Sequence, residues 1–202
     1  MVSIIGGKMK KILSTFLIIL ILLIGVTGCS TKNENLNDAE KFKQEYESLN
    51  KKSNGEVNYN KVSISKDNPI VYTTPKEIIE KINNGDLFVV YIGTNTSIEC
   101  RQIVESLLES AKEKNVNTIY YIDINKYDVT DLEKLLQSIN NKEEQEMLAS
   151  SPSVIAISKK KIVERETGLT TEQNQKKYAK NEFNCLFKCL AEESTTCKKN
   201  SC

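Results

Sequence analysis

Apolar residues follow two different periods between residues 57 and 191. Short apolar runs of strand length alternate with longer segments in which apolar residues recur every three or four positions, the spacing of a helix with one buried face. The resulting order is β-α-β-α-β-α-β-β-α. Strands are predicted at 57–65, 87–92, 119–124, 153–157 and 162–166, and helices between 74 and 85, from 96 to about 115, from 128 or 130 to 136 with a polar extension over 140–146, and from about 171 to 191.

Two of the predicted helices carry residues that suit helix ends. Thr74-Pro75 opens the first, because proline is favoured at the first helical position, and Gly85 closes it. Thr96, with Glu99 three residues later, matches a capping box and opens the second.

The strands at 87–92 and 119–124 are apolar without a break, which is typical of strands buried on both faces of a parallel sheet. Strands that alternate with helices imply parallel pairs with helices on both faces, and the last two strands form an antiparallel edge. The sequence therefore predicts the α/β class, with a central mixed sheet between two layers of helices.

A separate apolar run, 12–26, follows Lys8, Lys10 and Lys11. It is shorter than the roughly 20 apolar residues of a membrane span. A basic head, a short apolar centre and small residues before a cleavage point are typical of a secretory signal. The run ends in Val26-Thr27-Gly28-Cys29, which resembles the lipobox of bacterial lipoproteins and implies a diacylglycerol on Cys29. The alternative is an N-terminal anchor helix that is not cleaved.

Both interpretations place the rest of the chain outside the cytoplasm. Because two acyl chains attach a protein stably, we expect the lipid on Cys29 to hold it on the extracytoplasmic face of the cell membrane. The predicted parts are a signal peptide at 1–28, a polar tether at 29–55 with a weak helix over 39–49, a main domain at 56–191, and a cysteine-containing tail at 192–202.

Charge and composition exclude several functions. Without the three signal lysines, the 28 basic residues become 25 against 27 acidic residues, a net charge of −2. Nucleic-acid-binding proteins carry a basic patch or stripe, so no nucleic acid is expected as a partner. The chain has no histidine, which removes the commonest general base and every metal site that needs imidazole. No cofactor and no metal are predicted.

The segment 87–96, followed by Ser97-Ile98-Glu99-Cys100, resembles the active-site strand, turn and helix of the thioredoxin family. Ser151-Pro152, just before a strand, resembles the family's cis-proline, which implies that Pro152 faces the motif and that Ser151 pairs with the substrate backbone. Tyr91-Ile92-Gly93 is similar to extracytoplasmic thioredoxin-like proteins, some of them bacteriocin-transport accessory proteins. The resemblance covers 57–191 and implies a thioredoxin fold.

The motif differs from that of the family at the positions that carry out thiol-disulfide exchange. The family carries Cys-x-x-Cys, and Ser97 stands at the first, attacking cysteine. A hydroxyl forms no mixed disulfide, and no histidine exists to activate it for hydrolysis. Thr96 replaces the usual tryptophan, and Tyr91 replaces the buried acid. Cys100 begins an apolar helical stripe, which favours a buried, inert thiol over a single redox thiol.

The last eighteen residues contain Cys185, Cys189, Cys197 and Cys202. In an exported protein such a cluster favours disulfides, and Cys185 and Cys189 lie on one helix face, where a bond between them fits poorly. We favour 185–202 with 189–197; a four-thiolate zinc site and a redox relay remain alternatives.

Two function classes stay open from the sequence. One is a module that binds exported polypeptides through the groove beside Pro152, with weak or absent thiol-disulfide exchange. The other is an oxidoreductase or isomerase-like factor that uses Cys100 or the tail cysteines. Because Ser97 stands at the attacking position, we favour the binding module.

Overall fold

The structure is a computed structural model that describes residues 36–50, 59–139, 152–159, 161–167 and 175–191. The helices are α2 Asp38–Glu47, α3 Pro75–Asn84, α4 Ile98–Glu113, the 3-10 turn η1 Ile124–Lys126, α5 Val129–Ser138 and α7 Gln175–Ala191. The strands are β1 Ile70–Tyr72, β2 Phe88–Gly93, β3 Ile119–Asp123, β4 Ser153–Ser158 and β5 Lys161–Thr167. From β1 onward this is the predicted order of elements.

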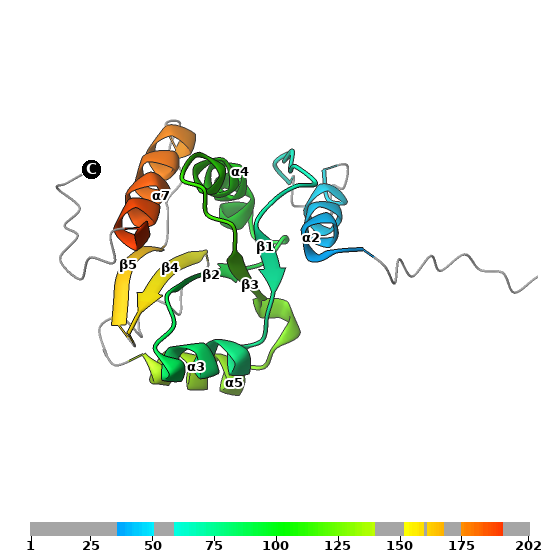
Figure 1. The fold of residues 1–202 in the computed structure, drawn as a ribbon. Coiled ribbons are helices and arrows are strands. Elements are labelled where there is room, and N and C mark those ends of the chain that lie inside the picture. The colour runs from blue at the N-terminus through cyan, green and yellow to red at the C-terminus, as the bar shows by residue number, and fades with distance from the viewer. Residues whose placement is uncertain (1–35, 51–58, 140–151, 160, 168–174, 192–202) are drawn as a thin grey trace, which may run out of the picture. The chain divides into compact units, whose positions relative to one another are not determined.

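One mixed sheet organises these elements, with the strand order β1-β3-β2-β4-β5 (Figure 1). β3 pairs in parallel with both β1 and β2, and β4 pairs antiparallel with both β2 and β5. Two parallel crossovers on one side of β2 and a closing antiparallel hairpin on the other are the topology of the thioredoxin fold. The predicted fold class and the predicted antiparallel edge are confirmed.

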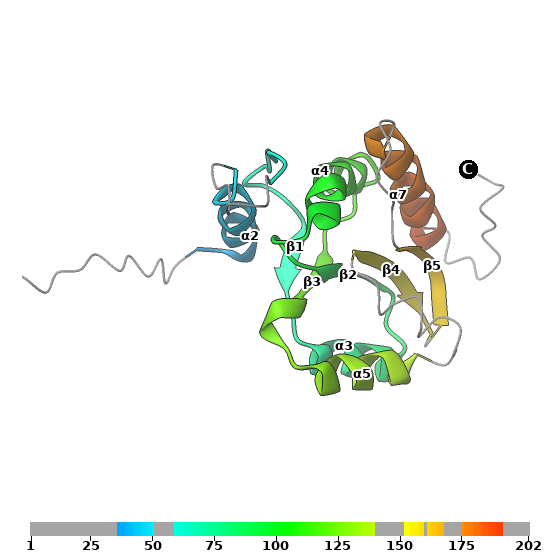
Figure 2. The same ribbon diagram turned by 180° about the vertical axis from the view of Figure 1, so that it is seen from behind.

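Helices cover both faces of the sheet. α4 and α7 lie on one face, and α3 and α5 lie on the other, as both views show (Figures 1 and 2). Each face has its own apolar core: one contains Val89, Leu107 and Phe183, and the other contains Ile78, Val90 and Ile155. Residues 89 and 90 belong to different cores because successive strand residues point to opposite faces.

The capping residues of α3 and α5 lie where the sequence predicts them. The Thr74 side chain accepts a hydrogen bond from the Glu77 N–H, and the Glu77 carboxylate accepts one from the Thr74 N–H. Gly85 ends α3 with φ 79°, a left-handed conformation that costs other residues energy. Asp128 caps α5, which selects the first of the two predicted starting positions.

The predicted strand at 57–65 is wrong over the described residues 59–65, which belong to no strand. Val62 and Ile64 are buried in alternation, as the pattern suggested, but no strand pairs with them. The Val62 N–H donates to the Asn50 side chain, and the Ile64 N–H donates to the Glu47 carboxylate. Side chains from α2 and the residues after it therefore satisfy this backbone, and the first strand begins later, at Ile70.

The predicted polar tether extends too far into the chain. Within 29–55, residues 38–47 form helix α2, which buries Phe42 and Tyr46 completely in the core beneath α4. Two aromatic residues four positions apart on one helical face dock a segment that is polar elsewhere. The compact unit therefore begins at Leu36 rather than at residue 56.

The predicted signal peptide, lipidated Cys29, residues 140–146 and the tail 192–202 lie outside the described residues. Among the helices that the structure describes, none is long and apolar enough to cross a membrane.

Helix α2 gives a first test of the fold. Replacing Phe42 by alanine should lower the free energy of unfolding by about 3–5 kcal/mol, since a buried aromatic ring is lost. Replacing the exposed Gln44 of the same helix should change it by less than about 0.5 kcal/mol. Urea unfolding followed by circular dichroism measures both variants. Equal, small effects would show that α2 does not belong to the folded core.

Candidate functional site

The candidate site is the turn between β2 and α4, at the carboxyl end of the sheet's central strand. Ser97, not Thr96 as predicted, is the N-cap of α4, and its Oγ accepts a hydrogen bond from the Cys100 N–H at 3.1 Å. The same hydroxyl donates to the Glu99 carboxylate at 2.8 Å. Ser97 is one residue closer to Glu99 than the predicted cap, Thr96. The Glu99 carboxylate therefore accepts from the Ser97 hydroxyl and not from the backbone N–H of a capping box. The residue at the attacking position is therefore used for helix capping.

Cys100, in the first turn of α4, is fully buried with an exposed fraction of 0% and is not in a disulfide. Its Sγ accepts a hydrogen bond from the Thr94 N–H at 3.4 Å. A Cβ added to Gly93 would lie 2.9 Å from this sulfur and 2.9 Å from the Tyr91 hydroxyl oxygen. The thiol is thus enclosed between α4, the end of β2 and a phenol, and the predicted position in the core stripe is confirmed.

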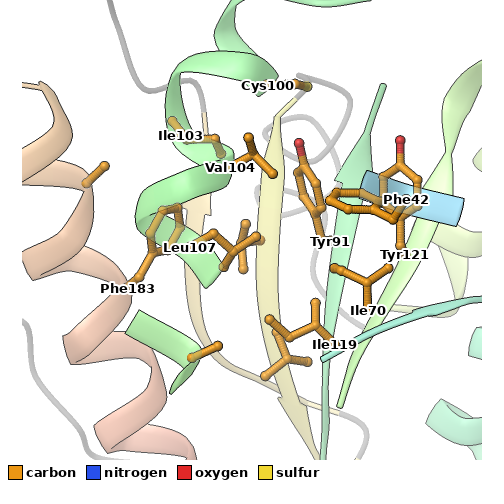
Figure 3. Close-up of a cluster of buried hydrophobic side chains, with 14 of the residues drawn as sticks. Phe42, Ile70, Tyr91, Cys100, Ile103, Val104, Leu107, Ile119, Tyr121 and Phe183 are labelled. Carbon is orange, nitrogen blue, oxygen red and sulfur yellow. The ribbon is translucent and has the colours of Figure 1, made fainter. Parts of the chain in front are cut away.

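Buried phenols form the floor beneath the thiol. The hydroxyls of Tyr46 and Tyr91 are 2.9 Å apart, and the Tyr121 hydroxyl donates to the Gly93 carbonyl at 3.4 Å. Figure 3 shows the Tyr91 hydroxyl pointing toward Cys100. Burial, and then the nearby Cys100, raises the pKa of both Tyr46 and Tyr91 well above the ordinary value. These phenols stay neutral, so Tyr91 places no negative charge beside the thiol.

Arg101, directly after Cys100, is a buried cation with an exposed fraction of 1%. Its guanidinium donates to the carbonyls of Tyr46 (2.7 Å) and Asn60 (2.6 and 3.0 Å) and to the Asn50 side chain (2.8 Å). Among the described residues it forms no ion pair with a carboxylate, and burial lowers its pKa. Arg101 therefore links α4 to three points of the segment that precedes β1.

Polar side chains around the turn hold it in one conformation. The Asn125 amide donates to the Thr94 hydroxyl at 2.7 Å, which joins η1 to the turn. On the other side, the Asn95 amide donates to the Glu45 carbonyl at 2.8 Å, and Lys126 bridges the Glu45 carboxylate and Asp123. Both α2 and η1 thus support the turn.

Pro152 lies next to this turn. The antiparallel register pairs Ile92 with Ser153, so the preceding residue, Pro152, falls beside Gly93 at the end of β2. Pro152 is buried, and Ser151 lies outside the described residues. Of the predicted site residues, the fold thus brings Ser97, Cys100 and Pro152 together at the carboxyl end of β2.

Cys185 and Cys189 lie elsewhere, in α7. Both are buried, and both are disulfide-bonded. Phe183 and Leu186 are buried beside them in the core between α7 and the sheet. Cys197 and Cys202 lie outside the described residues, so the pairing stays a prediction.

No described group of three or more histidine, cysteine or acidic side chains could hold a metal ion. A shallow polar cavity of about 240 Å³ lies between Asn68, Lys112 and Asn117, at the edge of the sheet opposite to the turn. The turn itself presents a capped helix and an enclosed thiol, a geometry in which the Cys100 thiol is not exposed.

The comparisons with known proteins add a weak structural likeness. No family model matches the chain, and no curated protein matches it. Among solved structures, the chain is similar to thioredoxin O2 from Arabidopsis thaliana in the oxidized state, with 16% sequence identity and a TM-score of 0.39. That match covers 51% of this chain and 85% of the other. The assignment of the fold rests on the strand order and register.

Sequence reasoning missed Arg101 and Tyr46. Their side chains act on the site from positions that look ordinary in the sequence: an arginine in the first turns of a helix, and a tyrosine in a polar segment. The one available signal was the four-residue spacing of Phe42 and Tyr46, which marks a helical face.

Replacing Arg101 by methionine tests whether its hydrogen bonds outweigh the cost of burying its charge. We expect a loss of about 2–4 kcal/mol in unfolding free energy, since several buried oxygens lose their donors. The partly exposed Lys126→Met should cost less than about 1 kcal/mol. A gain in stability for Arg101→Met would show that desolvation of the cation dominates.

Proposed function

We propose that this protein is a binding module of the thioredoxin fold, which recognises exported polypeptides beside Pro152 and has weak or absent thiol-disulfide exchange. The observation that carries the proposal is the state of the motif: the Ser97 hydroxyl caps α4, and the Cys100 thiol is fully buried. Exchange needs an accessible thiolate that attacks a disulfide. Neither residue supplies one in this conformation.

The parts of the site that would bind a chain, rather than cut or reduce it, are retained. The turn, the start of α4 and Pro152 lie together at one edge of the sheet. Ile98, the first residue of α4, is a large apolar residue that is exposed, at 36%, which is uncommon among the residues that the structure describes. An extended polypeptide with an apolar side chain would find an apolar contact at Ile98. By resemblance to the family, Ser151 would pair with its backbone.

We further propose that the protein works at the extracytoplasmic face of the cell membrane, anchored by a lipid on Cys29. The support is the sequence alone: a basic head, a short apolar run and the lipobox-like Val26-Thr27-Gly28-Cys29. The similarity to bacteriocin-transport accessory proteins points to a secreted peptide as one kind of client. That similarity rests on Tyr91-Ile92-Gly93.

The alternative function is a thiol-disulfide oxidoreductase or isomerase that uses Cys100 or the tail cysteines. Cys185 and Cys189 keep this alternative open, because both are in disulfides that a client thiol could attack. Their burial argues for a stabilising role instead.

The exchange assay separates the two functions. In insulin reduction with dithiothreitol, the chain from Ser30 onward should perform no better than its Cys100→Ala variant. Ser97→Cys should gain activity, because a thiol at the helix N-terminus is favoured as thiolate. Activity in the wild type that is lost in Cys100→Ala would overturn the binding proposal. Activity lost only in a Cys185→Ala/Cys189→Ala variant would assign it to the tail.

Binding itself needs a separate measurement. Unfolded secreted polypeptides should bind the wild-type domain in fluorescence anisotropy, and Ile98→Asp should weaken that binding by about tenfold, as expected for one lost apolar contact that is worth about 1.4 kcal/mol. Val129→Asp, which changes an apolar residue that is 70% exposed at the start of α5, is the matched control. Equal loss in both variants would show that the contact is not at the turn.

The anchor is tested in living cells. The wild type should fractionate with membranes and incorporate labelled palmitate, and Cys29→Ala should lose the label, because acylation requires the cysteine sulfur. Membrane association of Cys29→Ala without any label would instead support an uncleaved anchor helix.

A further inference from the structure

Helix α2 is attached to the domain by a small apolar surface. Phe42 and Tyr46 are its buried residues, and its remaining side chains are partly or fully exposed. The Phe42 ring packs against Tyr46 and Tyr121 with centroids 4.5 and 4.9 Å apart. Two aromatic anchors are a modest attachment compared with α4, which buries eight residues along its length.

Hydrogen bonds complete the attachment: some join Asp38 and Glu45 to Tyr72 of β1, and others join the carboxyl end of α2 to the candidate site. The last turn of a helix leaves carbonyls without intrahelical partners. In α2, the Glu45 carbonyl accepts from the Asn95 amide at 2.8 Å, and the Tyr46 carbonyl accepts from the Arg101 guanidinium at 2.7 Å. The turn and the first turns of α4 therefore hold the carboxyl end of α2.

Polar groups buried under α2 lower the cost of its opening. The Arg101 guanidinium and the hydroxyls of Tyr46 and Tyr91 are all removed from water in the closed state. Burying a cation without a counter-ion carries a desolvation cost that its hydrogen bonds must offset. When α2 moves away, these groups are hydrated again, which offsets part of the apolar burial lost at Phe42. Such elements open at lower free energy than the whole domain unfolds.

We propose that α2 is a clasp that opens while the rest of the domain stays folded, and that its opening exposes the Cys100 thiol beside Pro152. The Tyr46 hydroxyl of the clasp is hydrogen-bonded to the Tyr91 hydroxyl. The Tyr91 hydroxyl and the Cys100 sulfur both lie close to the Cα of Gly93. The clasp therefore controls access to the floor of the site. This inference rests on the proposed function for its meaning, since it concerns the same site, but its test needs no client.

The test measures how fast the Cys100 thiol reacts. The oxidised full-length protein in detergent is treated with an aromatic disulfide reagent at increasing urea, below the unfolding transition, and peptide mapping assigns the label. The slope of the opening free energy with urea scales with the surface exposed. We expect a slope for Cys100 that is less than about half of the global value. A slope equal to the global one would overturn the proposal.

Two variants locate the opening. Asn95→Ala removes a hydrogen bond to the clasp and should speed labelling by about fivefold, the effect of roughly one hydrogen bond. Ser110→Ala is the matched control: its hydroxyl donates to the Lys180 carbonyl at 3.2 Å, between α4 and α7. It should change labelling by less than about twofold if the clasp moves alone. Equal acceleration in both variants would overturn the proposal.

A measurement on the wild type covers the case in which a variant fails to fold. Amide hydrogens of α2 should exchange with the same opening free energy as Cys100 labelling, and those of β2 should exchange only with global unfolding. Exchange of α2 and β2 together would contradict the clasp. If the clasp opens but no polypeptide binds, the proposed function fails and the clasp remains. If polypeptides bind while α2 opens only with the whole domain, the clasp proposal fails and the proposed function stands.

Discussion

The burial of the Arg101 guanidinium determines how the N-terminal part of the domain is built. A cation without a carboxylate partner remains inside a protein only if its N–H groups find acceptors. Here the acceptors are the Tyr46 and Asn60 carbonyls and the Asn50 side chain, which come from separate points of the chain. Satisfying one side chain therefore fixes the end of α2, the approach to β1 and the start of α4 at once.

The same geometry explains the state of the motif. Because Arg101 and Asn95 hold α2 against the turn, the phenol of Tyr46 lies on that of Tyr91, and the Cys100 thiol is closed off from solvent. Ser97 is the N-cap of α4, and its hydroxyl accepts a hydrogen bond from a backbone N–H, the usual role of a serine at this position. The thioredoxin fold here carries a capping hydroxyl and a buried thiol at the turn between β2 and α4. Fold alone does not fix function, and here the side chains at the turn leave the Cys100 thiol buried and the Ser97 hydroxyl engaged in capping.

Most of the architecture could be predicted because it depends on local patterns. The alternation of apolar runs predicted every strand from β2 onward. Thr74 and Gly85 marked the two ends of α3, and Asp128 was one of the two starts predicted for α5. The errors have physical causes. The segment 59–65 alternates like a strand, but side chains from outside the sheet satisfy its backbone. The segment before it looks like a tether because only two of its helical residues are apolar and buried.

The sequence by itself determined the fold class, the end of the central strand where the candidate site lies, and the presence of Ser97 rather than a cysteine three residues before Cys100, because each follows from residue identity and spacing. The proposed anchor at Cys29 rests on the sequence pattern alone. Only the tertiary structure decided that Cys100 is enclosed by phenols and that α2 is part of the domain. These depend on contacts between residues 40 to 55 positions apart, such as Arg101 with Tyr46. Short-range patterns carry no information about such pairs, because the residues meet only after the sheet has formed.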